Sequence, residues 1–508
     1  MSTKTLKRIT LWCLLVAVVA CAVCGAFGLN YKYNTIYHTV SQEPSGLNVT
    51  FYNGQLSRGF SWWTEDGYGF ETKLYLSETP FKDEDLSKAK LSKSNIGGDH
   101  IEGIYLIEGK TCAIPDNTRW GRIFSIEYLN HTVFAEGLIL DQQYYYAVGG
   151  NGEFSFGEFE TENDLKTVVV NFSDFQTNDG TKLSWGSKTL NAAIGASNLN
   201  IDFFAFGGDF TSTFTIGKQS FNHYLGWIKS RDSIARQINS TPLVMAPGNH
   251  DATDDLFTSN NALLYQGVSD NGGYYSFDYN NLHFVVLNSN QFDKQQQSWL
   301  EADLKKANSD KKTEWTVIMT HKGPYTTGDH GLDMEKEFVE KLSKLCSEYR
   351  VDLVLQAHDH TYSKTRPYLW GGKGVMTSEN DPSVINASVN TVTKKGIEYD
   401  FNPNGTYYVS CGASGHRIGE NAEYAISTGE KSFTHREYKV AAATIEVDSV
   451  YADIGDVASI DLGRNMFGIL EIDGGSLIYS FYAVDDNGKA VLFDRLAILK
   501  ENADAKTQ

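Results

Sequence analysis

Side chains of the kinds that bind metal ions end five short apolar segments in the middle of the chain. The segments are TVVVNFSD, IDFFAFGGD, PLVMAPGNHD, WTVIMTH and DLVLQAHDH. Their ends supply, in chain order, Asp174, Asp209, Asn249 with His250, His321, and His358 with His360. A single aspartate before a turn is ordinary, because its side chain often closes the turn itself. Five such ends in succession indicate a shared site.

The elements that would position these side chains alternate between strands and helices. Each apolar segment has the length of a buried strand, and helical spacing follows in residues 221–238, 295–307 and 334–349. Such alternation predicts a largely parallel α/β sheet. Ligands of these sheets bind at the carboxyl ends of the strands, so we expect the five ends to meet at one edge. Residues 274–279 and 282–287 predict an added antiparallel hairpin.

The order of the motifs resembles the calcineurin-like metallophosphoesterases, and most closely their purple acid phosphatase branch. That branch carries Asp-x-Gly or a variant, Gly-Asp-x-x-Tyr, Gly-Asn-His-Asp/Glu, a histidine after a strand, and Gly-His-x-His. The matching stretches here are SDFQ, GDFTS, GNHD, IMTH and AHDH. The likeness extends to RGFSWWT, THKGPY and HDHTYSKTRP, and it covers residues 47–500.

The resemblance implies two metal ions that share one carboxylate. Asp209 would be the shared ligand. The remaining ligands would be Asp174 and His360 for the first ion, and Asn249, His321 and His358 for the second. His250 would stand outside this set, facing the substrate phosphate, and would protonate the leaving group.

The chemistry of this ligand set agrees with such a reaction. Carboxylate, imidazole and amide oxygen suit iron, manganese or zinc, whereas a thiolate site would need cysteines among the ligands. Two ions about 3.5–4 Å apart lower the pKa of a water molecule and bind phosphoryl oxygens during in-line attack. We expect hydrolysis of phosphomonoesters on small molecules or proteins. The alternatives are a phosphodiesterase or nucleotidase at the same metals, and a surface binding protein without catalysis.

Three positions depart from the pattern of the branch. Ser212 stands where the branch has a tyrosine ligand, so the ferric tyrosinate colour should be missing here. Gln176 stands where Gly or His is usual, as a weak neutral ligand or as a turn residue. Ala357 replaces a Gly, which matters only if the backbone there needs a positive φ.

Four further residues are weaker candidates. His283 lies within an apolar segment and is interpreted as a core histidine. Tyr325, His330 and His416 lie on predicted loops that could overhang the site and touch the substrate.

The first thirty residues predict an uncleaved signal anchor. Lys4, Lys7 and Arg8 precede an uncharged segment, residues 9–29, that would rise about 31 Å as a helix and so match the hydrocarbon core. Basic residues before the span place the rest of the chain outside the cytoplasm, at the membrane surface. A cleaved signal peptide, giving a secreted protein, and a lipoprotein modified at Cys21 are the alternatives.

The remainder of the chain predicts two domains. Residues 45–162 carry short β-like runs between Gly, Asn and Asp turns, which predict an all-β sandwich, and RGFSWWT makes it resemble a fibronectin type III-like domain. Residues 165–500 would form the α/β catalytic domain, an αββα metallophosphoesterase sandwich by the same resemblance. The net charge of −19 argues against nucleic acid as a partner, because a nucleic-acid surface needs a basic patch.

Overall fold

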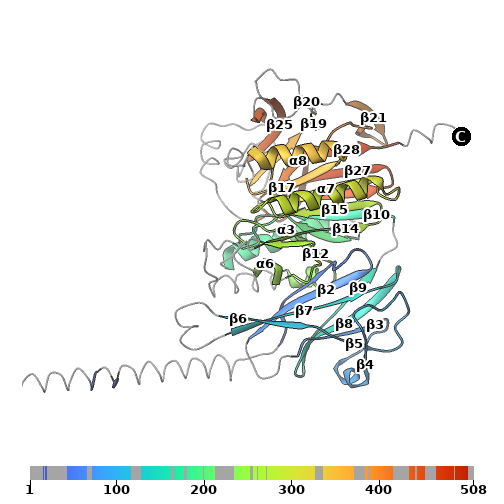
Figure 1. Ribbon diagram of the computed structural model, residues 1–508, viewed down its shortest axis with the longest axis vertical. Coiled ribbons are helices and arrows are strands. Elements are labelled where there is room, and N and C mark those ends of the chain that lie inside the picture. Colours follow the sequence, from blue (N-terminus) through green and yellow to red (C-terminus); the bar gives the residue numbers. More distant parts are fainter. Residues whose placement is uncertain are drawn as a thin grey trace, which may run out of the picture.

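The computed structural model describes most of the chain (Figure 1). The described residues are 15–16, 18–19, 43–65, 71–115, 127–161, 165–176, 180–197, 200–211, 234–251, 256–259, 261–269, 272–325, 336–370, 384–386, 389–412, 414–415, 434–440, 443–451, 465–484 and 487–501. Within these ranges, no helix is both long and apolar enough to cross a membrane. Most of the predicted signal anchor lies outside them, as do Ser212, His330 and His416. The anchor therefore stays a prediction.

The N-terminal part of the chain is a β-sandwich, drawn in blue to cyan in Figure 1. Its two sheets have the strand orders β1-β2-β7-β6 and β4-β5-β3-β8-β9. The strands are β1 (Ser45–Thr50), β2 (Ser57–Glu65), β3 (Lys73–Ser77), β4 (Lys90–Leu91), β5 (Tyr105–Glu108), β6 (Lys110–Pro115), β7 (Glu127–Glu136), β8 (Gln142–Gly150) and β9 (Glu153–Thr161). Trp62, Leu74 and Tyr146 are buried between the sheets. The predicted sandwich is confirmed, and its likeness to fibronectin type III stays a prediction.

The rest of the described chain contains two large sheets. The first has the order β12-β11-β10-β26-β27-β28-β22-β21. Its strands are β10 (Lys166–Phe172), β11 (Phe203–Phe206), β12 (Leu243–Met245), β21 (Asn390–Lys394), β22 (Ile397–Phe401), β26 (Asn465–Asp473), β27 (Ser476–Val484) and β28 (Ala490–Leu499). Strands β10, β11 and β12 are parallel, and β26 lies antiparallel beside β10.

The second sheet has the order β13-β14-β15-β16-β17-β23-β18-β25-β24. Its strands are β13 (Gly267–Ser269), β14 (Gly272–Tyr279), β15 (Leu282–Leu287), β16 (Trp315–Lys322), β17 (Leu353–Ala357), β18 (Thr361–Thr365), β23 (Tyr407–Cys411), β24 (Thr434–Val440) and β25 (Ala443–Tyr451). Strands β19 (Tyr368–Trp370) and β20 (Val384–Asn386) form a separate two-stranded sheet. The predicted hairpin is confirmed as β14 and β15, which are antiparallel.

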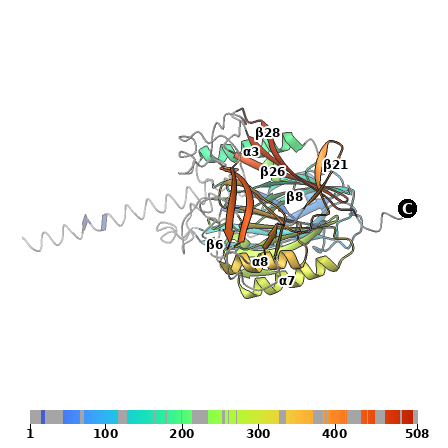
Figure 2. The ribbon, with the colours of Figure 1, turned by 90° about the horizontal axis from the view of Figure 1, so that it is seen from above.

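Helices cover the outer faces of the two sheets, and apolar side chains of both sheets share one core between them. Helix α3 (Gly180–Ser197) lies on the first sheet, and α7 (Lys294–Ser309) and α8 (Lys336–Glu348) lie on the second. Figure 2 shows α3 on the opposite side of the strands from α7 and α8. Also described are two single-turn helices, α5 (Ala235–Ile238) and α6 (Leu256–Ser259), and the 3-10 helix η2 (Asp83–Lys88). This is the predicted αββα arrangement of layers.

The prediction of one sheet edge is wrong in one respect. The five apolar segments divide between the sheets, with three in β10, β11 and β12 and two in β16 and β17. The C-terminal strand β26 pairs with β10 and ends the parallel run there, while β15 pairs with β16 and belongs to the second sheet. The polar strand ends therefore meet between two packed sheets rather than along one.

The sandwich is joined to the two-sheet core by an aromatic side chain. Phe51, which follows β1, is buried against Phe203, Phe277 and Tyr279, with ring centroids 5.2–5.5 Å apart. Thr50 Oγ1 also donates to the carbonyl of Ala262 over 2.7 Å. The two backbones lie so close that a Cβ at Gly59 would stand 1.9 Å from this same carbonyl oxygen. Glycine in RGFSWWT is thus required by the contact between the two parts.

Candidate metal centre

The predicted ligands stand directly after the strands that the sequence assigned to them. Asp174 follows β10, Asp209 follows β11, and Asn249 follows β12, whereas His321 lies at the end of β16 and His358 just after β17. The backbone is left-handed at five residues of this region, namely Asp174 (φ 54°), Gln176 (45°), Asp209 (58°), His358 (73°) and His360 (50°). Positive φ is uncommon outside glycine, and such conformations gather at functional sites.

His321 is fully buried, and its two ring nitrogens have different partners. Nδ1 lies 2.8 Å from the carbonyl oxygen of Gly207, which can only accept, so Nδ1 carries a hydrogen. Nε2 lies 3.0 Å from Asn249 Oδ1 and 3.3 Å from Asp209 Oδ1. Burial alone would lower the pKa of His321, but the carboxylates of Asp209 and Asp174 raise it to about 9. The surroundings of Nε2 therefore attract positive charge.

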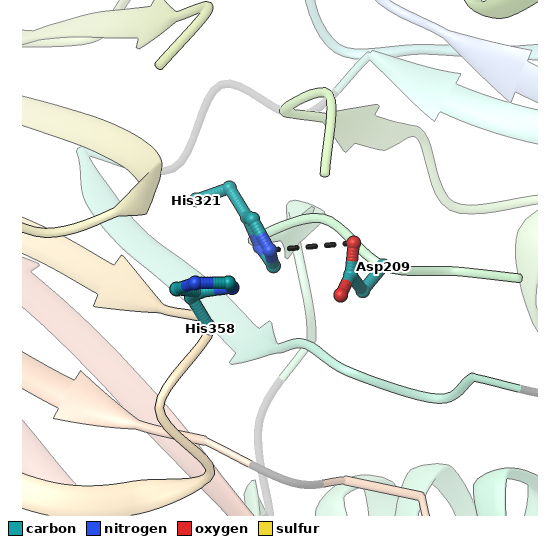
Figure 3. A group of neighbouring side chains, drawn as sticks. All are labelled: Asp209, His321 and His358. Atoms are coloured by element: carbon teal, nitrogen blue, oxygen red, sulfur yellow. Dashed lines mark ion pairs between the residues drawn. The ribbon is translucent and has the colours of Figure 1, made fainter. Parts of the chain in front are cut away.

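Asp209 lies at the centre of the group. Figure 3 shows its carboxylate facing the ring of His321, with His358 beside that ring. Ligand atoms of Asp209, His321 and His358 all lie within 4.8 Å of one another, and the two histidine rings meet edge to face with centroids 5.0 Å apart. Burial would raise the pKa of Asp209, but the charge of His321 holds it below its ordinary value. The carboxylate thus stays ionised in the buried site.

Asp174 and His360 form a second pair beside the first group. His360 Nε2 lies 3.4 Å from Asp174 Oδ1, and this buried oxygen accepts no hydrogen bond within the described part of the chain. Asp174 Oδ2 accepts from the Ser173 hydroxyl over 2.6 Å and from the backbone N–H of His358 over 3.4 Å. Despite burial, the charge of His360 keeps the pKa of Asp174 below its ordinary value.

His250 packs against the same central carboxylate. Its backbone N–H donates to Asp209 Oδ1 over 2.9 Å, and its ring Nε2 lies 3.6 Å from Asp209 Oδ2. All seven predicted site residues, Asp174, Asp209, Asn249, His250, His321, His358 and His360, therefore fall in one connected group. Which of them bind metal stays a prediction.

Asp251 belongs to this region, although the sequence analysis assigned it no role. It is fully buried, and its carboxylate accepts from the backbone N–H groups of Phe210, Thr211 and Gly248 over 3.0–3.2 Å. Asp251 thereby fastens the turn after Asp209 to the turn that carries Asn249. Burial and the nearby charge of Asp209 raise the pKa of Asp251 to about 7. Its place in GNHD was the only sequence signal.

Two glycines of the motifs are required by close packing. A Cβ at Gly248 would lie 2.0 Å from the backbone nitrogen of Asp209. A Cβ at Gly208 would lie 2.6 Å from His321 Nδ1, and Gly208 also has a φ of 99°. The glycines before Asp209 and Asn249 thus let the strand ends approach each other.

The departures from the family pattern have different outcomes. Ala357 ends β17 and is not left-handed, so its side chain is tolerated there. Gln176 is buried, and its Nε2 donates to Asp209 Oδ2 over 3.2 Å, which places its amide at the site.

Of the weaker candidates, only Tyr325 and His283 lie in the described part of the chain, and both are buried. Tyr325 is fully buried beside α8, where its hydroxyl meets Ser343 Oγ at 2.7 Å, so the prediction that it touches substrate is wrong. His283 is buried as predicted, but between two carboxylates rather than apolar groups. Its ring nitrogens lie 2.7 Å from Asp278 and 2.9 Å from Asp303.

Comparison with known proteins finds relatives of this chain among the phosphoesterases. Residues 168–362 match the family of calcineurin-like phosphoesterases. Purple acid phosphatase 22 of Arabidopsis thaliana is 28% identical over 321 residues, which cover 56% of this chain and 69% of that protein. Purple acid phosphatase 21 of the same plant is 28% identical over 44% of this chain and 51% of its own length. The chain thus spans about half to two thirds of these relatives.

The fold is also found in a solved structure. A purple acid phosphatase from yellow lupin (Lupinus luteus) seeds superposes with a TM-score of 0.60 and 15% identity. The superposition covers 92% of this chain and 76% of the lupin chain. The protein therefore has a calcineurin-like metallophosphoesterase core with homologues among the purple acid phosphatases.

Proposed function

We propose that the protein hydrolyses phosphomonoesters at a two-metal centre built on Asp209. One observation carries the proposal, namely the surroundings of His321 Nε2. Because Nδ1 holds the hydrogen that Gly207 accepts, Nε2 is the nitrogen that faces Asn249 Oδ1 and Asp209 Oδ1, 3.0 and 3.3 Å away, and in the neutral ring it presents a lone pair to them. Two oxygens and a lone pair repel one another unless a cation lies among them, and a proton or a metal ion fulfils this need.

The residues fit a metal ion better than a proton alone. The ligand types around Nε2 are imidazole, carboxylate and amide oxygen, and His358 adds a second imidazole within 4.8 Å. These ligands suit iron, manganese or zinc, and the Gly207 carbonyl orients His321 as outer partners of ligating histidines do. In this proposal Asn249, His321, His358 and Asp209 hold the second ion.

The first ion would lie between Asp209 and the pair of Asp174 and His360. Asp174 Oδ1 is buried and faces His360 Nε2 at 3.4 Å, so these two atoms are the ligand atoms expected on the side of the first ion. Gln176 supplies the further ligand in this proposal. Its amide lies 3.2 Å from Asp209 Oδ2, and rotation by 180° about its last torsion presents oxygen instead of nitrogen to an ion. This would compensate for the loss of the family tyrosine at Ser212.

When bound, the two ions would activate a water molecule and stabilise negative charge on the phosphoryl oxygens. The residues around them hold this arrangement in place. Asp251 fixes the two turns that carry Asp209 and Asn249. His250 Nε2 lies 3.6 Å from Asp209 Oδ2, and in this proposal its ring donates a proton to the leaving group.

Metal analysis combined with turnover tests the proposal. The full chain should contain two ions per molecule and hydrolyse an aryl phosphate monoester, and removal of both ions by a chelator should abolish turnover. Restoring zinc, manganese or iron should restore it. Undiminished turnover after verified removal of both ions would exclude the mechanism.

The substrate panel separates the alternatives. Faster hydrolysis of an aryl phosphate diester indicates the phosphodiesterase, and faster hydrolysis of a nucleoside monophosphate indicates the nucleotidase. Two bound ions with no turnover of any of the three substrates indicate the binding protein. Phosphorylated small molecules or proteins outside the cytoplasm, reached from a membrane anchor, remain the predicted setting.

A further inference from the structure

We propose that residues 288–290, which supply no predicted ligand, position both Asn249 and His321 for the second metal ion. The proposal rests on the proposed function, because positioning has a purpose only if an ion binds. The segment is the sequence Asn288-Ser289-Asn290, directly after β15. In it, Ser289 and Asn290 are the positioning residues.

Asn290 holds the turn that carries Asn249. Its Nδ2 donates to the carbonyl oxygens of Pro247 and Gly248, each over 3.2 Å. Both partners can only accept, so the amide nitrogen must face them, and an aspartate could not replace this residue. These are the two carbonyls before Asn249, and their position fixes where the Asn249 side chain begins.

Ser289 holds the strand that carries His321. Its Oγ, which is buried, accepts from the backbone N–H of Lys322 over 2.9 Å. The pairing of β16 with β17 is irregular between Met319 and Lys322, and His321 lies inside this irregularity. Such irregularities redirect a side chain but leave backbone groups unpaired. Ser289 Oγ accepts the backbone N–H of Lys322, the residue next to His321. At this point the main-chain pairing of β15 with β16 has already ended, at Leu287.

Helix α7 holds the segment from behind. Asn288 donates its backbone N–H to Gln296 Oε1 over 2.8 Å, and Gln296 Nε2 returns a bond to the Asn288 carbonyl over 3.0 Å. Gln296 is fully buried in the first turn of that helix. The Asn288 side chain in turn accepts from the backbone N–H of Asn290 over 3.0 Å. These hydrogen bonds to helix α7 and within the segment hold the backbone of residues 288–290 in place independently of the site.

The contacts of Asn290 and Ser289 together set the separation between the Asn249 and His321 side chains. Asn290 acts on the Asn249 side and Ser289 on the His321 side, and Asn249 Oδ1 lies 3.0 Å from His321 Nε2. Mutation of residues that hold metal ligands in place through hydrogen bonds weakens metal binding by about 10–100-fold. The second ion should therefore bind more weakly without Asn290, while the first ion, held by Asp174 and His360, should not.

A matched pair of alanine variants tests this inference. Asn290→Ala removes an amide at one end of β15, and Asn281→Ala removes one at the other end. Asn281 Nδ2 likewise donates to two oxygens, Glu314 Oε2 over 2.7 Å and the Gly474 carbonyl over 3.3 Å, but none of them is near the site. Each chelated full-length variant is titrated with Zn²⁺ in a calorimeter, and Asn249→Ala identifies which of the two binding events belongs to the second ion.

We expect Asn290→Ala to weaken that event by about 10–100-fold and to leave the other within about threefold. Asn281→Ala should bind both ions as the unaltered protein does, even if its melting temperature falls as much as that of Asn290→Ala. Ser289→Ala should weaken the same event, and Ser289→Thr, which keeps the hydroxyl, should restore it. Equal Zn²⁺ binding by Asn290→Ala and Asn281→Ala would overturn this inference alone. Failure of the unaltered protein to bind Zn²⁺ would overturn the proposed function as well.

Discussion

The sandwich and the metal centre each bury a histidine almost completely but surround it with opposite chemistry. In the sandwich, His131 stacks on Trp62, and its nitrogens meet the hydroxyls of Thr64 at 2.8 Å and Thr72 at 2.7 Å. Burial among these neutral partners lowers the pKa of His131 to about 4. At the metal centre, the carboxylates around His321 outweigh its burial and raise its pKa to about 9. Partners, rather than depth, decide which charge a buried histidine carries.

His283 shows that positive charge alone does not make a ligand. Burial opposes its protonation, but the carboxylates of Asp278 and Asp303 raise its pKa to about 9, as at His321. Here both ring nitrogens are taken by separate carboxylates on opposite sides. In His321, by contrast, Nδ1 donates to the Gly207 carbonyl, and Nε2 faces two oxygens, Asn249 Oδ1 and Asp209 Oδ1. A candidate ligand is thus recognised by acceptors gathered at one nitrogen.

The largest expected effect distinguishes the shared carboxylate from an unshared one. Asp209→Asn should lose both ions, and activity should fall by more than the about 10–100-fold typical of residues behind the ligands. Asp174→Asn should lose only the first ion. Metal content per chain, measured after desalting, checks both. Equal loss of one ion in the two variants would contradict the central position of Asp209.

The next effect concerns the histidine that binds no metal in our proposal. His250→Ala should lower turnover by about 10²–10⁴-fold, the usual contribution of a general acid, and should keep both ions. The deficit should shrink for aryl phosphates whose leaving groups need no proton. Turnover across a series of leaving groups, with metal content as control, measures this. A variant without metal would show that His250 is a ligand.

Asp303→Asn tests the histidine held between two carboxylates. It should cost about 1.5–3 kcal/mol in the free energy of unfolding at pH 7, because a charged hydrogen bond is lost in a buried site. The pKa of His283 is raised from 6.5 to about 9, so its stabilisation is complete below pH 6.5 and lost as pH rises through 9. The difference from the unaltered protein in urea unfolding should therefore narrow between pH 7 and 10. Asp310→Asn, at the exposed end of the same helix, is the control.

The smallest effect has the opposite sign. His131 has its pKa lowered from 6.5 to about 4, so the unfolded chain binds its proton first, and stability is lost as pH falls below 6.5. Between pH 6.5 and 5.5 this amounts to about 1 kcal/mol. His131→Gln should remove that part of the pH dependence of unfolding. An unchanged slope would mean that His131 is already charged in the folded sandwich.

Local patterns were enough to predict the strand ends and the residue types of the site. The apolar segments before Asp174 and His321 have strand length, and the hairpin before Asn288 was predicted from two short strand-like segments on either side of residues 280–281. Their division between two sheets had no local signal, because β26 joins β10 from the far end of the chain, with Ile469 beside Val170. Similarly, Ser289 and Asn290 act through bonds to distant backbone groups, and nothing in their own neighbourhood marks them.

Phe51 makes the packing of the two-sheet core depend on the sandwich. Since its ring fills a place among Phe203, Phe277 and Tyr279, cutting the chain near residue 163 would divide the sequence but not the packing. Without the sandwich, the two-sheet core would expose the apolar surface formed by Phe203, Phe277 and Tyr279 to water and would aggregate. An exchange of sandwiches between related proteins, in evolution or in engineering, should therefore succeed only when the incoming sandwich brings an aromatic ring to this apolar surface and a glycine at the position of Gly59.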